Sequence, residues 1–117
     1  MNKQIIGDMG QAAAEKYLCA KNYSIVARNF RSRYGEIDLI AHDGSYVVFV
    51  EVKLRKNITY GHPREAVGHT KQRRIYNTAC HYIATQNLTD CDFRFDVVEI
   101  LTEKGMLKVI HIENAFN

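Results

Sequence analysis

Features that would direct the chain into a membrane or an oxidising compartment are scarce in this sequence. The first residues, MNKQIIGDMGQ, contain no apolar core of signal-peptide length, and no later stretch approaches the length of a membrane span. The three cysteines are odd in number and no two of them form a close pair, which favours reduced thiols over a disulfide or zinc framework. We therefore expect a cytoplasmic protein with no membrane partner.

Zinc motifs and a strong excess of one charge are also missing. The five histidines include no HExxH or comparable ligand pair, which argues against a zinc site. The net charge of +3 and the pI near 8.8 are compatible with a polyanionic partner but do not identify one. A length of 117 residues and an apolar fraction of 46% fit one globular domain, spanning residues 1–117.

Hydrophobic periodicity predicts an α/β fold with the element order αβββαβ(β). Apolar residues at helical spacing predict one helix over residues 3–21 and a second over about residues 64–86. Between them, residues 56–63 form a loop that contains the only proline. Strands are predicted over residues 24–30, 35–41, 46–54, 93–101 and 107–112. A mixed β-sheet flanked by helices is the natural way to bury these elements.

The strongest local signal is the sequence HDGS at 42–45, which joins the second and third strands. A central Asp-Gly pair is typical of a tight β-hairpin. If Asp43 and Gly44 form a two-residue turn, Asp38 pairs with Phe49 across the hairpin. A four-residue loop keeps the same faces together, so the assignment of faces does not depend on the choice between these two turns.

This register brings a group of charged side chains to one face of the hairpin, namely Glu36, Asp38, Glu51 and Lys53. Asp38 becomes a diagonal neighbour of Glu51, at roughly 7–8 Å between backbones and within side-chain reach of a shared ion. Carboxylates at this spacing repel one another, and partial burial increases the repulsion. A positively charged group must therefore lie close to these carboxylates and offset their charge.

Two interpretations account for this cluster. In the first, Lys53 and nearby arginines neutralise the carboxylates in a structural salt-bridge network. In the second, which we favour, Asp38 and Glu51 bind a hard cation such as Mg²⁺ or Mn²⁺. Such a cation lowers the pKa of a bound water and polarises a phosphoryl oxygen, and Lys53 could orient that water. These parts suffice for phosphodiester hydrolysis.

The sequence GEIDLI at 35–40, followed by VFVEVKLR at 48–55, resembles the D-x(n)-E-x-K core of the PD-(D/E)XK nuclease superfamily. The wider run, through Lys71 to FRFDVV at 93–98, resembles the YraN-like family of small bacterial proteins, which is related to archaeal Holliday-junction resolvases. This resemblance covers nearly the whole chain. It implies a restriction-endonuclease-like fold and a metal-dependent endonuclease that cuts structured or branched DNA.

The resemblance also assigns roles to individual residues. It implies metal ligation by Asp38 and Glu51, with the backbone carbonyl of Val52 as a third ligand, and it makes Lys53 the catalytic lysine. Members of the family usually carry Gly-Glu near the start of the first helix, where this chain has Gly10-Gln11.

A glutamine oxygen can ligate a cation or its water, but without a charge, so Gln11 is a weaker metal ligand than the usual glutamate. Glu15, one helical turn later, could compensate for it, and Glu36 could help to shape the site. The departure at Gln11 favours an alternative function, a nucleic-acid-binding module of the same fold with little or no catalytic activity.

Basic residues flank the predicted site and suggest a surface that follows a phosphate backbone. Lys71 lies between Val67 and Ile75 on the apolar stripe of the second helix, where its ammonium either extends to solvent at the edge or reaches the site. Tyr60 could stack on an unpaired base, although an ordinary loop aromatic is the simpler reading. The candidate nucleic-acid-binding residues are Arg55, Tyr60, Arg64, Lys71, Arg73 and Arg74.

The identity of the partner is less well defined than its class. DNA is favoured over RNA, and the oligomeric state stays open, with a homodimer as one alternative. In the fourth strand, Arg94 and Asp96 share a face and are expected to form a structural pair, while Phe93, Phe95 and Val97 on the other face are expected to be core.

Overall fold

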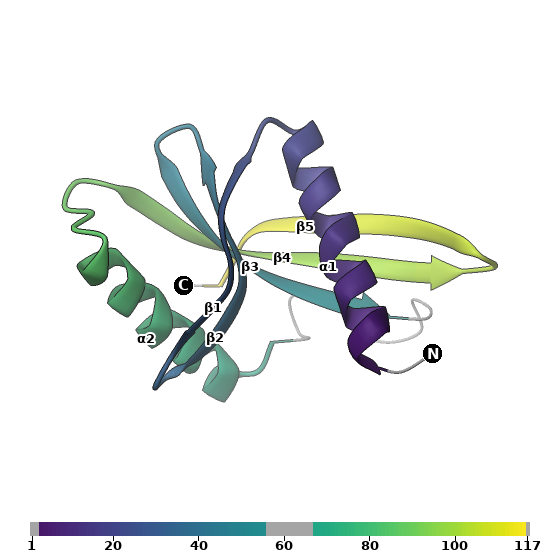
Figure 1. The fold of residues 1–117 in the computed structure, drawn as a ribbon, viewed down its shortest axis with the longest axis horizontal. Helices are drawn as coiled ribbons and strands as arrows, with labels where there is room; N and C mark the ends of the chain where they lie inside the picture. Colours follow the sequence, from purple (N-terminus) through teal and green to yellow (C-terminus); the bar gives the residue numbers. More distant parts are fainter. Residues whose placement is uncertain (1–2, 56–66, 117) are drawn as a thin grey trace.

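The structure, a computed structural model, describes residues 3–55 and 67–116 (Figure 1). The elements follow the predicted order, with the last strand present. They are α1 (Lys3–Ala20), β1 (Ser24–Ser32), β2 (Gly35–Asp43), β3 (Tyr46–Arg55), α2 (His69–Thr85), β4 (Asp92–Glu103) and β5 (Met106–Phe116).

The strands form one mixed five-stranded sheet in the order β1-β2-β3-β4-β5. All neighbours are antiparallel except β3 and β4, which are parallel. A parallel pair needs a crossover connection, and α2 lies in the segment that joins these two strands. The predicted α/β class with a mixed sheet and helices is confirmed.

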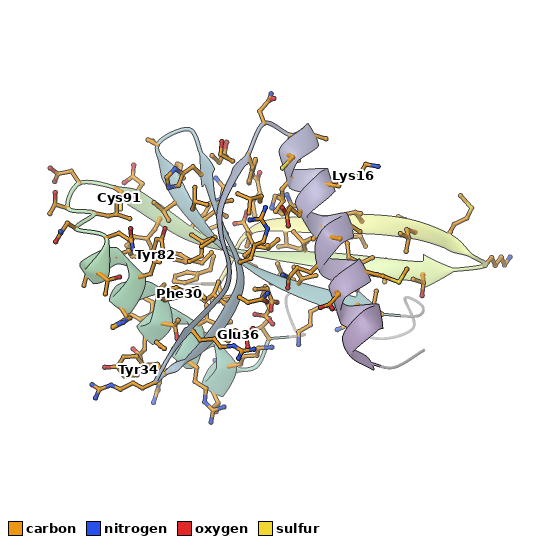
Figure 2. The ribbon with its side chains drawn as sticks, in the orientation of Figure 1. Lys16, Phe30, Tyr34, Glu36, Tyr82 and Cys91 are labelled. Atoms are coloured by element: carbon orange, nitrogen blue, oxygen red, sulfur yellow. The ribbon has the colours of Figure 1, made fainter. Side chains whose placement is uncertain are left out.

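The two helices cover opposite faces of the sheet (Figure 1). On the α2 face, Phe49 packs with Tyr82, and Phe30 of β1 meets the same tyrosine ring edge to face (Figure 2). On the α1 face, Leu18 packs with Val50. The central strand β3 is therefore buried on both sides, which explains its nearly continuous apolar sequence.

The second helix starts later than the periodicity predicts. It begins at His69, and residues 64–66 lie outside the described part of the chain. Gly68 precedes it in an extended conformation (φ −71°, ψ 166°), and Val67 is buried in the α2-face core. Glycine is a poor helix former, so a helical period that continues through residue 68 does not make that segment helical.

The β2–β3 turn differs from the predicted one by two residues in register. Asp43 pairs with Tyr46, so Gly44 and Ser45 form the turn, and Phe49 pairs with Ile40 instead of Asp38. Gly44 has φ 59°, the positive value that a two-residue hairpin turn requires at its first position. A two-residue shift alone keeps the faces of a regular strand, because side chains alternate with period two. In β2, however, the alternation breaks at Asp38: Ile37 and Ile40 lie in the α2-face core, whereas Leu39 and Ala41 lie in the α1-face core.

Candidate active site

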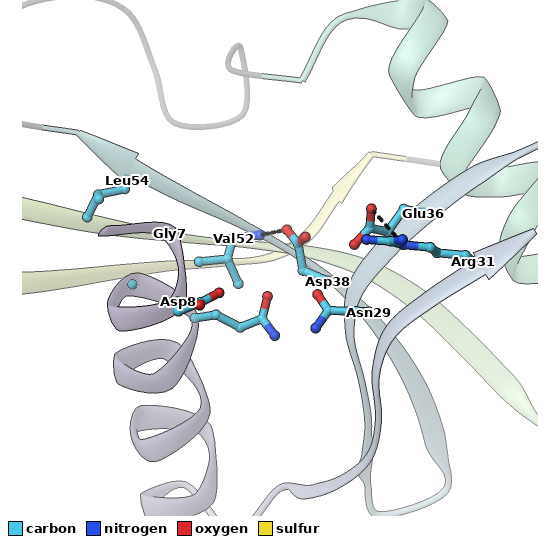
Figure 3. A pocket seen from close by; sticks show the side chains of 10 residues that line it. Gly7, Asp8, Asn29, Arg31, Glu36, Asp38, Val52 and Leu54 are labelled. Atoms are coloured by element: carbon cyan, nitrogen blue, oxygen red, sulfur yellow. Dashed lines mark hydrogen bonds and ion pairs between the residues drawn. The ribbon is translucent and has the colours of Figure 1, made fainter. Parts of the chain in front are cut away.

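The sheet opens between β2 and β3 at Asp38. The last described pair of these strands is Leu39 with Val50, and Asp38 has no place in the β1–β2 register either. At this position β3 is bonded to a side chain of β2 and not to its backbone: the N–H of Val52 donates to Asp38 Oδ2 at 2.8 Å (Figure 3). One carboxylate is thus held at the fork between two strands.

The backbone carbonyl of Val52 belongs to the same fork. In an extended strand, the N–H and the C=O of one residue point to the same side, toward the same neighbouring strand. Since the Val52 N–H points to Asp38, its carbonyl also faces β2. A backbone oxygen and a carboxylate therefore border one opening.

The second carboxylate, Glu51, lies next in the chain to Val52 and is almost completely buried. Lys71, in the first turns of α2, places Nζ 2.6 Å from Glu51 Oε1. Of the two readings of Lys71, the structure supports the one in which the ammonium reaches the carboxylate cluster. Its side chain is nevertheless 44% exposed, against 7% for Glu51, so Lys71 connects the buried site with solvent.

The electrostatics of the site are unbalanced. Burial, followed by the charge of Asp38, raises the pKa of Glu51 to about 6, and Lys71 only partly offsets this. Burial also raises the pKa of Asp38 against the opposing effect of the Val52 amide. For Lys53, burial and then the neighbouring Lys71 ammonium lower the pKa. Two carboxylates whose charged forms are disfavoured by burial lie beside a lysine that is easier to deprotonate than usual.

A cavity of about 370 Å³ opens on Asp38 from the α1 side. Figure 3 shows Asp8, Asn29 and Asp38 converging on it from α1, β1 and β2. Gln11 of α1 lines the same cavity, so the first helix does reach the predicted site. Next to it, Gly10 is buried against the Leu54 side chain of β3, which brings this turn of α1 close to the sheet.

Several residues that line this cavity were not predicted from the sequence, among them the polar residues Asp8 and Asn29. Asp8 lies three residues before Gln11, and that spacing could have identified it as a neighbour on the same helix face. Asn29 adopts φ 50°, in the left-handed region, in the middle of β1. Nothing in the periodicity of the strand indicates this, although asparagine is one of the few residues that tolerate such a conformation.

The two carboxylates predicted to support the site, Glu15 and Glu36, lie farther from its centre than predicted. Glu15 is not among the residues that line the cavity, and its carboxylate instead pairs with the Arg28 guanidinium, whose Nε lies 3.0 Å from both carboxylate oxygens. Glu36 lies on the cavity rim, 3.4 Å from Arg31 Nε. Within residues 3–55 and 67–116, no group of three or more His, Cys, Asp or Glu side chains is arranged to hold a metal.

The remaining donor set still fits a hard divalent cation. Asp38 and Glu51 offer carboxylate oxygens, Val52 offers a carbonyl oxygen, and Gln11 offers an amide oxygen across the cavity. Mg²⁺ and Mn²⁺ prefer such oxygen ligands, and Mg²⁺ is often bound by only one or two carboxylates while it keeps several waters.

Four of the six predicted nucleic-acid-binding residues, Arg55, Lys71, Arg73 and Arg74, lie within the described part of the chain. Arg74 packs against Gly35 so closely that a Cβ on that glycine would lie 3.3 Å from Arg74 Cβ. Arg73 lines a separate hollow on α2 with Tyr76. Arg55 places Nε 3.5 Å from the buried carboxylate of Glu99, so it is engaged within the fold. The predicted residues Tyr60 and Arg64 lie outside the described residues.

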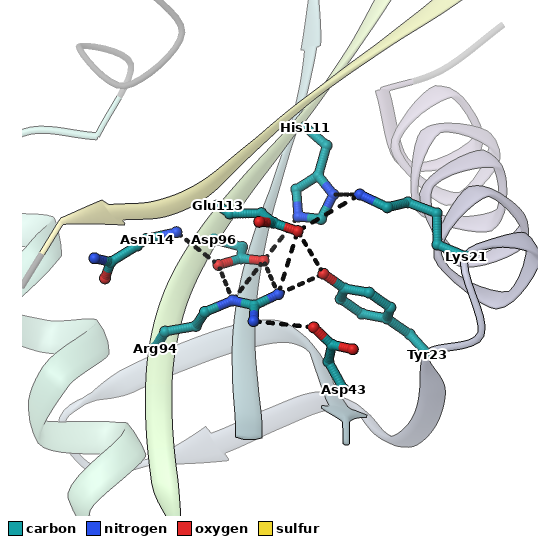
Figure 4. Close-up of polar contacts among 8 residues, drawn as sticks. All are labelled: Lys21, Tyr23, Asp43, Arg94, Asp96, His111, Glu113 and Asn114. Atoms are coloured by element: carbon teal, nitrogen blue, oxygen red, sulfur yellow. Dashed lines mark hydrogen bonds and ion pairs between the residues drawn. The ribbon is translucent and has the colours of Figure 1, made fainter. Parts of the chain in front are cut away.

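A second charged cluster lies on the α1 face of the sheet (Figure 4). The buried Asp96 accepts hydrogen bonds from Arg94 Nε at 3.1 Å and from the Asn114 N–H at 2.9 Å. The structural pair of Arg94 and Asp96 is therefore confirmed. On the other face of β4, Phe95 and Val97 are buried as predicted, but Phe93 is 39% exposed near the end of the strand.

Comparisons with known proteins place the chain among bacterial relatives. A model of the uncharacterised protein family UPF0102 matches residues 10–100. A UPF0102 protein of Clostridium acetobutylicum is 47% identical over 118 residues, covering 99% of this chain and 96% of the relative. One of Symbiobacterium thermophilum is 48% identical over 113 residues, covering 96% of each. One of Alkaliphilus metalliredigens is 44% identical over 111 residues, covering 95% of this chain and 96% of the relative.

The helices of the described residues are too short or too polar to cross a membrane.

Proposed function

Taking as premise that the chain belongs to the uncharacterised protein family UPF0102, we propose that it is a divalent-metal-dependent endonuclease of the PD-(D/E)XK type. In this proposal it has a restriction-endonuclease-like fold and hydrolyses phosphodiester bonds, with structured or branched DNA as the favoured substrate. The observation that carries the proposal is the strand fork, where Asp38, Glu51 and the Val52 backbone meet beside Lys53.

The cation would be held by the carboxylates of Asp38 and Glu51 and by the Val52 carbonyl, with Gln11 across the cavity. When bound, a divalent cation supplies Lewis-acid polarisation of a phosphoryl oxygen and a more acidic water. The hydrogen bond from the Val52 N–H fixes the Asp38 carboxylate before any ligand arrives. Such preorganisation is what a site needs if it is to act on charge that develops in a transition state.

Lys53 is the residue best placed to move or hold a proton in this site. It is partly buried on the same strand as Glu51, and both carboxylates contribute to its electrostatic environment. Because burial and the Lys71 charge lower its pKa, Lys53 gives up a proton more readily than an exposed lysine. It can therefore position an attacking water by hydrogen bonding and stabilise charge on the phosphate.

The first turns of α2 would hold the nucleic-acid backbone. Lys71 and Arg74 lie three residues apart on one helix face, which leads from Glu51 to Gly35 at the β1–β2 turn. That turn is fixed to the helix by Ser32 Oγ, 3.1 Å from Thr78 Oγ1, which in turn donates to the Arg74 carbonyl at 2.8 Å. Two cations on one helix face beside the carboxylates fit a phosphate backbone that passes the site.

A cleavage panel tests this proposal. Branched, flapped, single-stranded and duplex DNA, with matched RNA, are incubated with Mn²⁺, with Mg²⁺ and with excess chelator. We expect at least one substrate to be cut only with a cation, and Glu51→Ala and Lys53→Ala each to abolish cutting. Lys108→Ala, which removes an exposed lysine of β5, is the matched control and should cut like the wild type. Cutting that survives chelator or Lys53→Ala would refute the assigned site.

The binding-module alternative is favoured by one observation, the uncharged Gln11 on the cavity wall. A module that binds nucleic acid without cutting it has no need of a cation. Calorimetric titration of the protein with Mn²⁺ separates the two functions. Uptake of one ion, lost in Asp38→Asn, supports the endonuclease, whereas salt-dependent nucleic-acid binding with no ion uptake supports the module.

A further inference from the structure

Lys71 already holds one of the carboxylate oxygens that a bound cation would use. Its Nζ lies 2.6 Å from Glu51 Oε1, and its charge also acts on Asp38. With Lys53 nearby, two carboxylates face two ammonium groups, so the formal charge of the cluster is close to zero without any bound ion. The site therefore carries its own counter-ion.

A divalent cation cannot be added to this arrangement without a rearrangement. It would compete with the Lys71 ammonium for the same oxygen of Glu51 and would repel it at close range. Of the two lysines, Lys71 is the one that can leave. It extends from α2 on a flexible four-carbon side chain that is 44% exposed, whereas Lys53 is on the ligand-bearing strand itself.

The Lys71 ammonium, once released from Glu51, lies close to a second cation on the same helix face. One turn further along the same helix face lies Arg74, the other cation assigned above to the phosphate backbone. While the Lys71 ammonium is paired with Glu51 it is not free to bind a phosphate; once it turns outward, it can contact a phosphate beside Arg74.

We propose that Lys71 couples cation uptake to nucleic-acid binding: the incoming ion displaces its ammonium from Glu51, and the freed ammonium then binds a phosphate. This inference rests on the proposed function, because it assumes that Asp38 and Glu51 bind a divalent ion. Since each event favours the other, the ion tightens nucleic-acid binding and nucleic acid tightens ion binding by the same factor.

Through-space electrostatic attraction could also couple ion binding to nucleic-acid binding, but it predicts a different effect of removing Lys71. Adding a divalent ion changes the charge of the site by two whether or not Lys71 is present, so through-space attraction alone predicts the same coupling after Lys71 is removed. Displacement of Lys71 predicts that most of the coupling disappears. The coupling factor, and not either affinity alone, therefore tests the proposal.

The experiment measures two affinities in the wild type, Lys71→Gln and Arg74→Gln. Calorimetry gives the Mn²⁺ affinity of the free protein, and fluorescence anisotropy gives the affinity for a labelled flapped DNA duplex, without divalent ion and with Ca²⁺. Ca²⁺ takes the same oxygen ligands, and any cutting is monitored on a gel. Arg74→Gln is the matched control, because it removes a cation from the same helix face without touching Glu51.

We expect Ca²⁺ to tighten DNA binding about tenfold in the wild type, within the usual range for coupled sites, and about twofold in Lys71→Gln. Arg74→Gln should bind DNA more weakly but keep the tenfold coupling. Without DNA, Lys71→Gln should bind Mn²⁺ severalfold more tightly than either other protein, because the internal competitor is gone.

Wild-type coupling in Lys71→Gln, or no coupling in a wild type that binds Mn²⁺, would overturn the role of Lys71 and leave the proposed function intact. Failure of the wild type to bind Mn²⁺ would instead overturn the proposed function, and this inference with it.

Discussion

Two buried carboxylate clusters lie on this sheet, and they are satisfied in very different ways. Asp96, on the α1 face, accepts hydrogen bonds from Arg94, the Asn114 N–H and the His111 ring, whose Nε2 lies 2.7 Å away. Although burial raises its pKa, the His111 and Arg94 hydrogen bonds outweigh this and hold the pKa below the ordinary value. At the strand fork, Glu51 and Asp38 both have raised pKa values.

The same network determines which nitrogen of the His111 ring carries the proton (Figure 4). Lys21 Nζ lies 3.1 Å from Nδ1, and an ammonium can only donate, so Nδ1 accepts and Nε2 carries the proton that is donated to Asp96. Every oxygen of Asp96 thus has a donor in place.

The contrast separates a structural cluster from a functional one. At Asp96 hydrogen bonds more than offset the effect of burial on the pKa, whereas at the fork burial outweighs the hydrogen bonds and the neighbouring lysines. Groups kept in unfavourable electrostatic surroundings are typical of sites that bind ligands. The predictions below test whether the two clusters respond in opposite directions to the same kind of change.

The largest effect is expected from breaking the satisfied cluster. Arg94→Ala should lower the free energy of unfolding by about 3–5 kcal/mol, because it leaves the buried Asp96 without its cation. Urea denaturation measures this loss, and Arg33→Ala, which removes an exposed arginine, should change stability by less than about 0.5 kcal/mol. An equally small change in Arg94→Ala would show that the network does not stabilise the fold.

A smaller effect is expected from pH. The pKa of Glu51 is raised from 4.5 to about 6 in the folded protein, so between these values the folded state binds more protons than the unfolded state. The contribution of Glu51 therefore increases stability as pH falls from above 6 toward 4.5, by about 1–2 kcal/mol. Asp96 has the opposite sign, because its pKa is lowered and its contribution is lost as pH falls through the acid range.

Urea denaturation of the metal-free protein at pH 7 and pH 4.5 isolates the Glu51 contribution when the wild type is compared with Glu51→Gln. The wild type should gain stability over this interval relative to Glu51→Gln. Parallel pH profiles for the two proteins would mean that Glu51 is not held at a raised pKa.

Much of the fold was predictable because it depends on periodicity. The order of elements and the burial of β3 on both faces follow directly from the apolar pattern. An error of two residues in register leaves the faces of β3 unchanged, but periodicity does not indicate the break in alternation of β2 at Asp38. The turn itself was misassigned because Asp43-Gly44 and Gly44-Ser45 are both acceptable hairpin turns, and only the packing of β3 between its neighbours decides between them.

What the sequence could not predict depends on contacts between distant segments. Glu15 has helical spacing from Gln11, but β1 brings Arg28 to it and turns it into an ion pair. The polar partners of Arg94 are Tyr23, Asp43, Asp96 and Glu113, which come from four separate parts of the chain, so no local pattern contains this network. Lys71 could be placed on its helix stripe, whereas its contact with Glu51 required the angle at which α2 crosses the sheet.

The most direct test applies one substitution to both clusters and follows thermal unfolding with and without Mn²⁺. Asp38→Asn deletes a carboxylate charge that burial disfavours and that repels Glu51, so without metal it should melt above the wild type, by the equivalent of about 0.5–2 kcal/mol. Asp96→Asn deletes a fully paired carboxylate and should melt well below the wild type.

Mn²⁺ at about a hundred times its dissociation constant should raise the melting temperature of the wild type by on the order of 10 °C and that of Asp38→Asn much less. Asp96→Asn, although destabilised, should keep the full metal-dependent rise. An Asp38→Asn protein that melts below the wild type, together with no effect of Mn²⁺ on the wild type, would contradict the account and make the strand fork a structural salt-bridge cluster.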